Sequence, residues 1–229
     1  MLKFYFNAAP NPLKVGLFLE ESGLPYEGIA VDTRRGQQHD PAFLAINPNA
    51  KVPAIVDGEV VVFDSNAILL YLAEKTGQFL PQGTPAARGA MLSWLMFVAS
   101  GVGPFSGQAV HFRHVAPGEN PYPRKRYDYE ARRHWRIVDD RLALGRYMLG
   151  ERYTIVDMAV WGWAGRINYA LGDGAIAAYP NVARLMAEID ARPAGQRALG
   201  LKDRHAFKQE LDEAAMRAMY PQIFAPDPA

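Results

Sequence analysis

The stretch from Lys51 to Ser65 gathers residue types that could hold a small anionic ligand. It reads KVPAIVDGEVVVFDS and runs directly into a strongly helix-forming segment, residues 67–72. Asp64 and Ser65 are good helix N-cap residues. A helix N-terminus presents free backbone N–H groups and the positive end of the helix dipole, which together suit an anion. We therefore interpret Lys51–Ser65 as a candidate ligand site.

Two short predicted strands position this stretch. Residues 54–56 and 60–63 are mostly β-branched or aromatic, and the Asp57-Gly58 pair between them favours the tight turn of a β-hairpin. Pro53 opens the first strand, where the absence of its N–H is tolerated. Upstream, the pattern predicts a strand over 2–6, a helix over 13–22, a strand over 29–31 and a short helix over 41–46. The order βαβ followed by αββα predicts a thioredoxin-like α/β domain with four strands and helices on both faces.

In the second half of the chain, the hydrophobic periodicity predicts only helices. After the turn-rich segment 81–85, helices are expected over 88–100, over 124–146 and from about 180 to 192, with breaks at 101–104 and 117–123. A charged amphipathic helix is expected over 203–219, ahead of a Pro-rich end. We therefore expect a thioredoxin-like domain over 1–80, an all-α domain over 88–200 and a C-terminal helical tail over 201–229.

One local signal in the helical half concerns stability. Thr154 precedes an apolar run and Asp157 follows three residues later, the spacing of a capping box with Asp in place of Glu. The loss of such a cap costs about 1 kcal/mol. We interpret this pair as a structural device.

Composition excludes several classes of protein. The 229 residues are 49% hydrophobic and 21% charged, with a net charge of +1 and no Cys. The near-neutral charge argues against an electrostatic nucleic-acid binder. The lack of Cys excludes disulfides, thiolate metal sites and a cysteine nucleophile. No signal-peptide pattern and no apolar run of membrane-spanning length is recognised, so we expect a cytoplasmic protein without membrane or nucleic-acid partners.

These features together resemble the cytosolic glutathione transferases, most closely their bacterial Nu class. The resemblance covers roughly residues 1–200 and is carried by Lys51-Val52-Pro53, Asp64-Ser65, Thr154-x-x-Asp157, residues 4–11, 36–38, 65–72 and 101–104, and the His111-Phe112-x-His114 segment. It implies a protein that uses glutathione as co-substrate and forms a homodimer with the site near the interface.

The resemblance also implies roles for the first part of the candidate site. Val52-Pro53 is expected to be a cis peptide that turns the Val52 N–H and C=O toward the cysteinyl backbone of glutathione, as an added strand would. Lys51 and Gln38 are expected to hold its glycyl carboxylate end.

The other end of glutathione falls to the residues before the helix. Asp64 is expected to pair with the γ-glutamyl ammonium and Ser65 to bind its carboxylate, alongside their N-capping role. Arg133 is the better match to an arginine that reaches the site from the partner subunit, although Arg132 and Arg133 also fit a solvated basic helix face.

An enzyme of this kind must stabilise the glutathione thiolate, because a thiol with a pKa near 8.5 is only slightly ionised at neutral pH. The resembling class uses a Thr and an Asn after the first strand. Here Ala9 takes the place of the Thr among the cofactor-binding positions, so Asn11, or backbone N–H groups at the start of the helix, are expected to donate to sulfur. Asn11 also fits a plain N-cap or turn. Tyr5 is the rival, and its flanking Phe4 and Phe6 leave its direction open.

His111 and His114 are three residues apart, but no third ligand cluster is near, so we expect no metal. They fit either a pocket for the electrophile, with Phe105, Gln108 and Phe112, or plain packing.

Three functions are compatible with these features, and we expect the first, an enzyme, because the set of residues for glutathione is intact at Lys51, Pro53, Asp64, Ser65 and Asn11. The first is disulfide reduction by glutathione, which needs no protein Cys because the reactive sulfur belongs to the co-substrate. The second is conjugation of glutathione to small hydrophobic electrophiles, or hydroperoxide reduction. The third is a non-catalytic glutathione-binding module on the same fold.

Overall fold

A four-stranded sheet in the order β2-β1-β3-β4 forms the centre of the N-terminal domain. The strands are β1 (Leu2–Phe6), β2 (Tyr26–Ala30), β3 (Ala54–Asp57) and β4 (Val60–Phe63). β1 and β2 are parallel, whereas β1–β3 and β3–β4 are antiparallel, and Asp57 pairs with Val60 across the hairpin turn. The structure is a computed structural model that describes residues 1–225.

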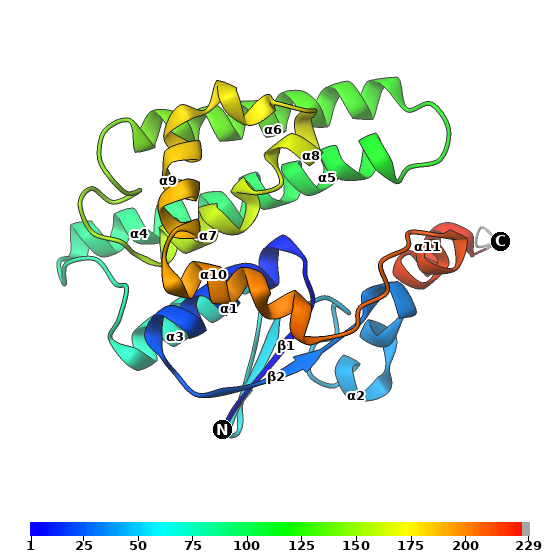
Figure 1. The fold of residues 1–229 in the computed structure, drawn as a ribbon, viewed down its shortest axis with the longest axis horizontal. Coiled ribbons are helices and arrows are strands. Elements are labelled where there is room, and N and C mark those ends of the chain that lie inside the picture. Colours follow the sequence, from blue (N-terminus) through cyan, green and yellow to red (C-terminus); the bar gives the residue numbers. More distant parts are fainter. Residues whose placement is uncertain (226–229) are drawn as a thin grey trace.

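Alternation along β1 distributes its aromatic side chains between the two faces of the sheet. Phe4 and Phe6 are buried on the face that α1 (Pro10–Ser22) and α3 (Ser65–Thr76) cover. Tyr5 points to the other face, against Phe43 of α2 (Pro41–Leu44). Two 3-10 turns, Thr33–Arg35 (η1) and Gln37–His39 (η2), occupy the predicted polar loop. The predicted thioredoxin-like arrangement is confirmed (Figure 1).

Several predicted boundaries in this domain are wrong by up to three residues, including the short helix predicted over 41–46, which ends at Leu44. The first helix begins at Pro10 instead of residue 13. Proline is tolerated in the first turn because the N–H groups there have no partner within the helix. The second strand is Tyr26–Ala30 rather than 29–31, since its pairing with β1 starts at Leu2.

The rest of the described chain is helical, as predicted. Its elements are α4 (Pro85–Phe97), a π-helical turn η3 (Val98–Val102), α5 (Gly103–His114), α6 (Pro121–Leu142), α7 (Ile155–Ala164), α8 (Ile167–Leu171), η4 (Ala175–Ala178), α9 (Pro180–Asp190), α10 (Pro193–Leu199), η5 (Gly200–Arg204), α11 (Glu213–Met219) and α12 (Pro221–Phe224). All ten residues of α7 are buried, and α7 packs against α1, α3, α4 and α9. It is therefore the central helix between the two domains.

The expected break at Gly101–Pro104 is a π-helical turn that continues the helix. Within the joined helix Pro85–His114, an 18-residue window has a mean hydropathy of 1.3, so this helix could cross a membrane by length and composition alone. Met91, Leu95 and Val102 along it are fully buried in the core. In this structure it packs as a core helix of the α domain.

The capping box at the start of α7 is confirmed. The Thr154 hydroxyl accepts a hydrogen bond from the Val156 N–H, and Asp157 Oδ2 accepts one from the Thr154 N–H at 2.8 Å. Asp157 Oδ1 also accepts from the Met148 N–H at 2.7 Å. Complete burial raises the pKa of Asp157 to about 6. The carboxylate thus anchors the loop before α7 as well as the helix.

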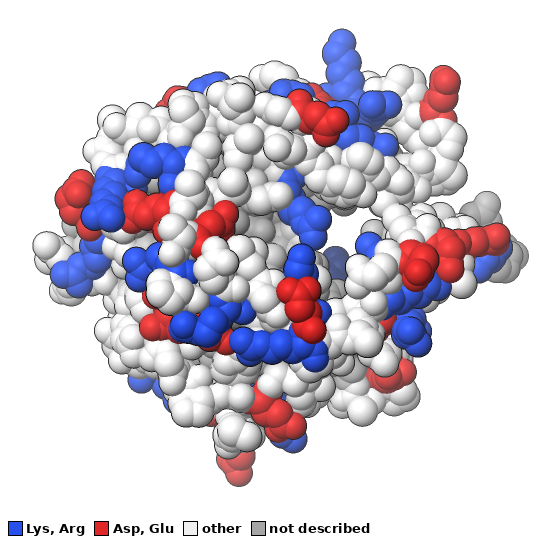
Figure 2. Space-filling view, viewed as in Figure 1, with Lys and Arg blue, Asp and Glu red and all other residues white. Residues whose placement is uncertain are grey.

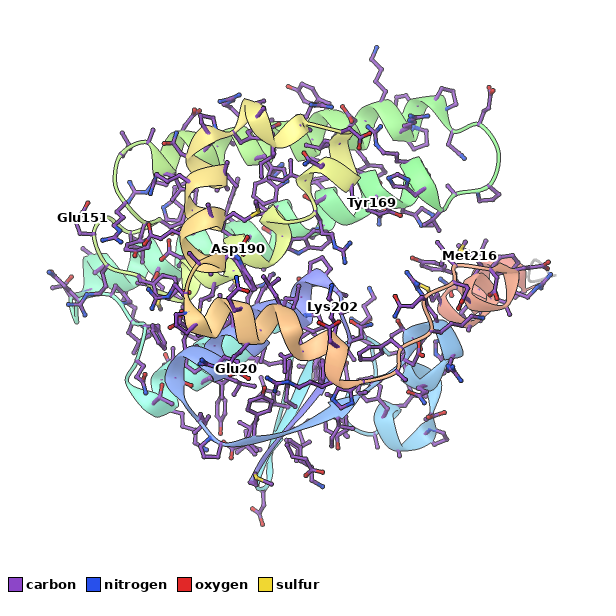
Figure 3. The ribbon with its side chains drawn as sticks, viewed as in Figure 1. Glu20, Glu151, Tyr169, Asp190, Lys202 and Met216 are labelled. Carbon is purple, nitrogen blue, oxygen red and sulfur yellow. The ribbon has the colours of Figure 1, made fainter. Side chains whose placement is uncertain are left out.

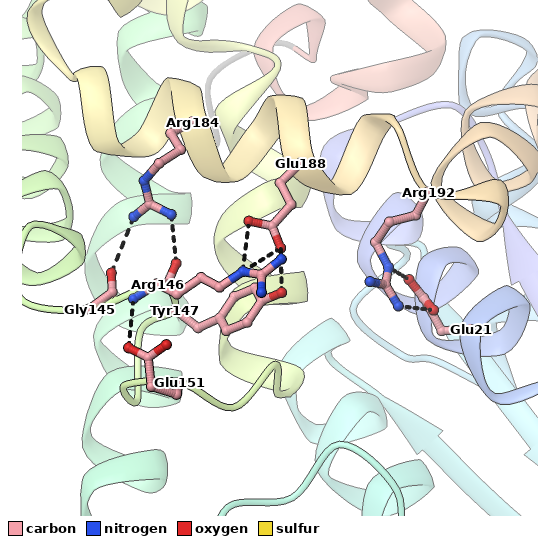
Figure 4. A network of polar contacts seen from close by, with 8 residues as sticks. All are labelled: Glu21, Gly145, Arg146, Tyr147, Glu151, Arg184, Glu188 and Arg192. Carbon is pink, nitrogen blue, oxygen red and sulfur yellow. Dashed lines mark hydrogen bonds and ion pairs between the residues drawn. The ribbon is translucent and has the colours of Figure 1, made fainter.

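A polar network ties α1 to the helices of the second domain (Figure 4). The Arg192 guanidinium binds both carboxylate oxygens of Glu21, with Nη2 2.9 Å from Oε2. Glu188 of α9 accepts from Arg146 and Tyr147. These contacts fix the first helix of the α/β domain against the α9–α10 corner.

The C-terminal segment differs from the predicted helix over 203–219. It leaves η5, crosses the α/β domain in extended form and then forms α11, which packs on η1 (Figure 1). Asp32 Oδ2 accepts from the Lys208 N–H at 2.7 Å, and Phe207 packs edge-on against Phe6. The segment is held by contacts with the sheet domain, which its own periodicity does not encode. The Pro-rich end over 226–229 lies outside the described residues.

Candidate functional site

The first turn of α1 offers one backbone donor. Pro10 and Pro12 have no N–H, and the Leu13 N–H donates to the Ala9 carbonyl at 3.3 Å. The Asn11 N–H makes no hydrogen bond within residues 1–225. Among the backbone groups that could donate at the start of this helix, the structure therefore singles out that of Asn11.

The side chain of Asn11 is oriented by Trp163 of α7. The indole Nε1–H donates to Asn11 Oδ1 at 2.9 Å. Because an indole can only donate, the amide oxygen must face Trp163, and the two Nδ2–H donors point elsewhere. A Cβ at Gly103 would lie 3.1 Å from this indole nitrogen, so Gly103 leaves space for the ring. The arrangement presents an NH₂ group at a helix N-terminus, where a thiolate would be stabilised.

Sequence reasoning missed Trp163. It lies 152 residues from Asn11 in the chain, and no local pattern links the two. The one signal that could have indicated Trp163 is its position on α7, all of whose residues are buried.

Ala9 and Tyr5 both have structural roles, one at a helix N-cap and the other in packing. Ala9 occupies the N-cap of α1 with no side-chain hydrogen bond, and its N–H donates to Asn7 Oδ1 at 2.9 Å. The Tyr5 ring lies 5.8 Å from that of Phe43, on the sheet face opposite α1. Tyr5 therefore faces away from the helix that carries Asn11, and its direction, which the sequence left open, is decided.

The Lys51-Val52-Pro53 segment forms a bend ahead of β3, in which Lys51 is exposed, Val52 is half-buried and Pro53 is buried. The Val52–Pro53 peptide is cis, as expected. Neither the N–H nor the C=O of Val52 has a hydrogen-bond partner in the described part of the chain. Asn47 Nδ2 donates to the Lys51 carbonyl at 2.6 Å and fixes the turn, while the Lys51 side chain remains exposed. An extended ligand backbone could pair with the two free groups of Val52.

Asp64 and Ser65 start α3 in the predicted way. Asp64 has a φ of 71°, an unfavourable region for a residue with a Cβ. Its Oδ1 accepts from the Asn66 and Ala67 N–H groups, which leaves Oδ2 for another partner. Strain of this kind is concentrated at functional sites. Ser65 is 3% exposed, and its hydroxyl accepts a hydrogen bond from Lys14.

Gln38 is in a different environment from the one expected. It is buried, and its Nε2 donates to the Ala218 carbonyl of α11 at 2.9 Å. Its Oε1 has no partner within residues 1–225. The C-terminal segment therefore occupies the amide donor that was expected to face a ligand carboxylate, a contact between residues 180 positions apart.

Arg133 lies on α6, apart from these residues. Its Nε donates to Glu130 Oε2 at 2.9 Å, and its Nη2 lies 3.4 Å from His134 Nε2. The His134 ring in turn stacks on Phe97 of α4. Arg133 therefore lies beside the outer surface of α4 and α6.

The two histidines of α5 are used differently. The His114 ring stacks on Tyr169 with centroids 4.0 Å apart, and its Nε2 bonds to the Tyr169 carbonyl oxygen. His111 contacts the Tyr220 ring at the end of α11, and burial lowers its pKa. Within residues 1–225 no cluster of three His, Cys, Asp or Glu could hold a metal.

Phe105 and Phe112 were expected as possible pocket residues. Both rings pack against Tyr127 of α6, with Phe112 stacked at 5.3 Å. Of the α5 residues considered, His111 is the one shown in contact with the C-terminal segment.

A deep hollow lies between the helical domain and the C-terminal segment (Figure 2). Charges of both signs are scattered over this face. Tyr169 lies at the edge of the helical domain and Met216 lies on α11 at the other side (Figure 3). The hollow is open to solvent. It lies between the helical domain and the C-terminal segment, which contact each other through the His111 and Tyr220 rings.

Two family models match the chain. The model for the glutathione S-transferase N-terminal domain matches residues 2–74, and that for the glutathione S-transferase C-terminal domain matches residues 122–188. The chain is 44% identical over 206 residues to the disulfide-bond oxidoreductase YfcG of Escherichia coli, covering 87% of this chain and 94% of that protein.

Two solved structures are similar in fold. A glutathione transferase family member from Pseudomonas fluorescens, with two glutathione bound, is 39% identical with a TM-score of 0.81, over 86% of this chain and 92% of that one. A glutathione transferase from Pseudomonas putida, with one glutathione disulfide bound per subunit, is 36% identical with a TM-score of 0.81, over 87% and 91% of the two chains.

Proposed function

This chain belongs to the glutathione transferase family, and from that premise we propose that it is an enzyme that reduces disulfides with glutathione. The observation that carries the proposal is the Asn11 amide at the N-terminus of α1, which Trp163 holds so that neither Nδ2–H donor is bonded within residues 1–225. Donors fixed before the reaction stabilise developing charge without reorganisation. The name of the Escherichia coli relative and the glutathione disulfide in the Pseudomonas putida structure support the same chemistry.

The glutathione site in this proposal has three parts. The Val52 N–H and C=O pair with the cysteinyl backbone, and Lys51 attracts the glycyl carboxylate. Asp64 Oδ2 binds the γ-glutamyl ammonium while its Oδ1 caps α3. Ser65 binds the γ-glutamyl carboxylate. Gln38 contributes to this site indirectly, by holding α11, because its amide nitrogen already donates to the Ala218 carbonyl.

The reaction follows from thiol–disulfide exchange. A glutathione thiolate, stabilised by Asn11, attacks one sulfur of the substrate disulfide. The S–S bond breaks, a mixed disulfide forms and the other half leaves as a thiolate that takes up a proton. A second glutathione thiolate then attacks the mixed disulfide, releasing glutathione disulfide and the second thiol. The chain has no Cys, so both reacting thiols come from glutathione.

The test compares two activities of the wild-type protein. We expect it to catalyse reduction of bis(2-hydroxyethyl) disulfide by glutathione, followed with a coupled glutathione reductase assay, more strongly than conjugation of glutathione to a small aromatic electrophile. Conjugation without disulfide reduction would replace the proposal with a general transferase. Calorimetric binding of glutathione with neither activity would replace it with a binding module.

We also propose that the protein is a homodimer. β4 is an edge strand, and Val61 and Phe63 on it are 46% and 44% exposed. Met96 of α4 is 47% exposed beside the partly buried Phe97. An isologous dimer would bury the strip on β4 against the α4 strip of the other copy. Arg133, next to His134 and Phe97, would then lie close to the partner's α/β domain.

This assembly predicts a mass of two chains by light scattering. Val61→Glu places a charge in the proposed interface at an exposed position, so we expect a folded monomer with an unchanged far-ultraviolet circular dichroism spectrum. A matched Glu59→Gln change on the same hairpin should leave the dimer intact. A monomeric wild-type protein would refute the dimer.

The proposed function also includes a cytoplasmic location and the domain limits 1–80, 88–200 and 201–229.

A further inference from the structure

Lys14 of α1 is a buried charged group that the proposed reaction does not use. Its side chain is 1% exposed. Lysine is almost never fully buried unless it is paired, because the ammonium loses its hydration. Burial lowers the pKa of Lys14 to about 7, against the opposite effect of Asp64. Retaining such a group in the core disfavours folding, which indicates a role other than packing.

The fold leaves room for this side chain. A Cβ at Gly162 of α7 would lie 2.4 Å from Lys14 Cγ and 2.7 Å from the Pro10 carbonyl oxygen. Any larger residue at position 162 would collide with the lysine stem. The stem therefore passes between the two domains along a path that Gly162 keeps open.

The path ends beneath the start of α3. Lys14 Nζ donates to Ser65 Oγ at 3.3 Å. An ammonium has three donors, and this is the one hydrogen bond that Lys14 Nζ makes within residues 1–225. Since the Ser65 hydroxyl accepts from Lys14, its own hydrogen is available to an acceptor on the ligand side.

Other charged groups on the elements around α1 already have partners. Glu20 pairs with Arg197 of α10, and Asp157 of α7 is bonded to the loop before that helix. Asp64, at the start of α3, is the charged group whose field acts on Lys14. A ligand anion would therefore be the second negative charge next to the Lys14 ammonium, after that of Asp64.

We propose that Lys14 is a positioning residue for glutathione, whose ammonium fixes the Ser65 hydroxyl and supplies the positive charge beneath the γ-glutamyl carboxylate. This inference rests on the proposed glutathione function. It implies that the site selects ligands with a free carboxylate at that end. A carboxylate beside Lys14 favours its protonated form, so ligand binding takes up protons and weakens as the pH rises above about 7.

The test measures binding by calorimetry with two ligands. S-methylglutathione has no thiol to titrate, and its analogue with 4-aminobutyryl in place of γ-glutamyl lacks one carboxylate. The wild-type protein is expected to bind S-methylglutathione about three- to tenfold more weakly at about pH 8.5 than at about pH 6, and the analogue weakly at both. Lys14→Met should bind S-methylglutathione at least about tenfold more weakly at about pH 6 and lose the wild-type pH dependence. It should bind the analogue as the wild type does.

Thermal unfolding separates this role from a structural one. Lys14→Met keeps the length of the stem and removes a buried charge, so its unfolding temperature is expected to rise. Lys75→Met, at an exposed lysine of α3, should retain wild-type binding. The proposal is overturned if Lys14→Met binds S-methylglutathione as the wild type does. It is also overturned if the variant loses affinity for both ligands equally. If the wild-type protein binds neither ligand, the proposed function itself fails.

Discussion

Replacing Asn11 by alanine is expected to lower kcat/KM for disulfide reduction at least about tenfold, which corresponds to about 1.4 kcal/mol of barrier. The change removes the two Nδ2–H donors that Trp163 directs away from itself. The pKa of the bound glutathione thiol should rise by about one unit, measured from the ultraviolet absorbance of the thiolate against pH. The affinity for S-methylglutathione should remain close to that of the wild type, because the alanine variant keeps every proposed contact to the peptide part of the ligand.

Two further variants show whether the amide itself is responsible. Asn11→Asp keeps the shape but places a carboxylate near the thiolate, so a larger loss than for Asn11→Ala is expected. Trp163→Phe keeps a large aromatic ring and removes the indole N–H, so the amide loses its fixed orientation and an intermediate loss is expected. If Asn11→Ala retains full activity, the stabilising donor is instead the Asn11 backbone N–H, which alanine preserves.

Asp157→Ala is expected to lower the free energy of unfolding by about 3–4 kcal/mol, because buried N–H groups left without an acceptor cost about 1–3 kcal/mol each. The Asp157 carboxylate accepts from the Met148 N–H, the Thr154 N–H and the Thr154 hydroxyl, and it is fully buried. Domains are stable by only about 5–15 kcal/mol, so this single change removes a large share. Urea unfolding at neutral pH, followed by tryptophan fluorescence, measures the loss.

A matched cap elsewhere in the chain provides the control. Asp212 caps α11 through one hydrogen bond to the Ala215 N–H, and it is exposed. Asp212→Ala removes the same kind of side chain from a helix start where water can replace the acceptor. It should shift the unfolding midpoint far less than Asp157→Ala. Equal shifts in the two variants would show that burial of the carboxylate does not set its contribution.

The sequence by itself determined the local parts of the site. Lys51-Val52-Pro53 and Asp64-Ser65 each place their groups through a turn or helix start encoded within a few residues, and the structure has these features where they were predicted. The same is true of Thr154 and Asp157. Such short patterns are readable because backbone propensity and capping chemistry act over a single turn of chain. The order of strands and helices, set by hydrophobic periodicity, likewise indicated the fold.

The tertiary structure decided which distant groups complete those parts. The Trp163 donor to Asn11, the Lys14 donor to Ser65 and the α11 carbonyl that binds Gln38 join residues 152, 51 and 180 positions apart. None of these pairs leaves a periodic or capping signal in the sequence, because each depends on how α1, α7 and the C-terminal segment pack on the sheet. The direction of Tyr5 depended in the same way on which face of the sheet α1 covers. The proposed site is therefore assembled from local motifs by contacts that packing alone specifies.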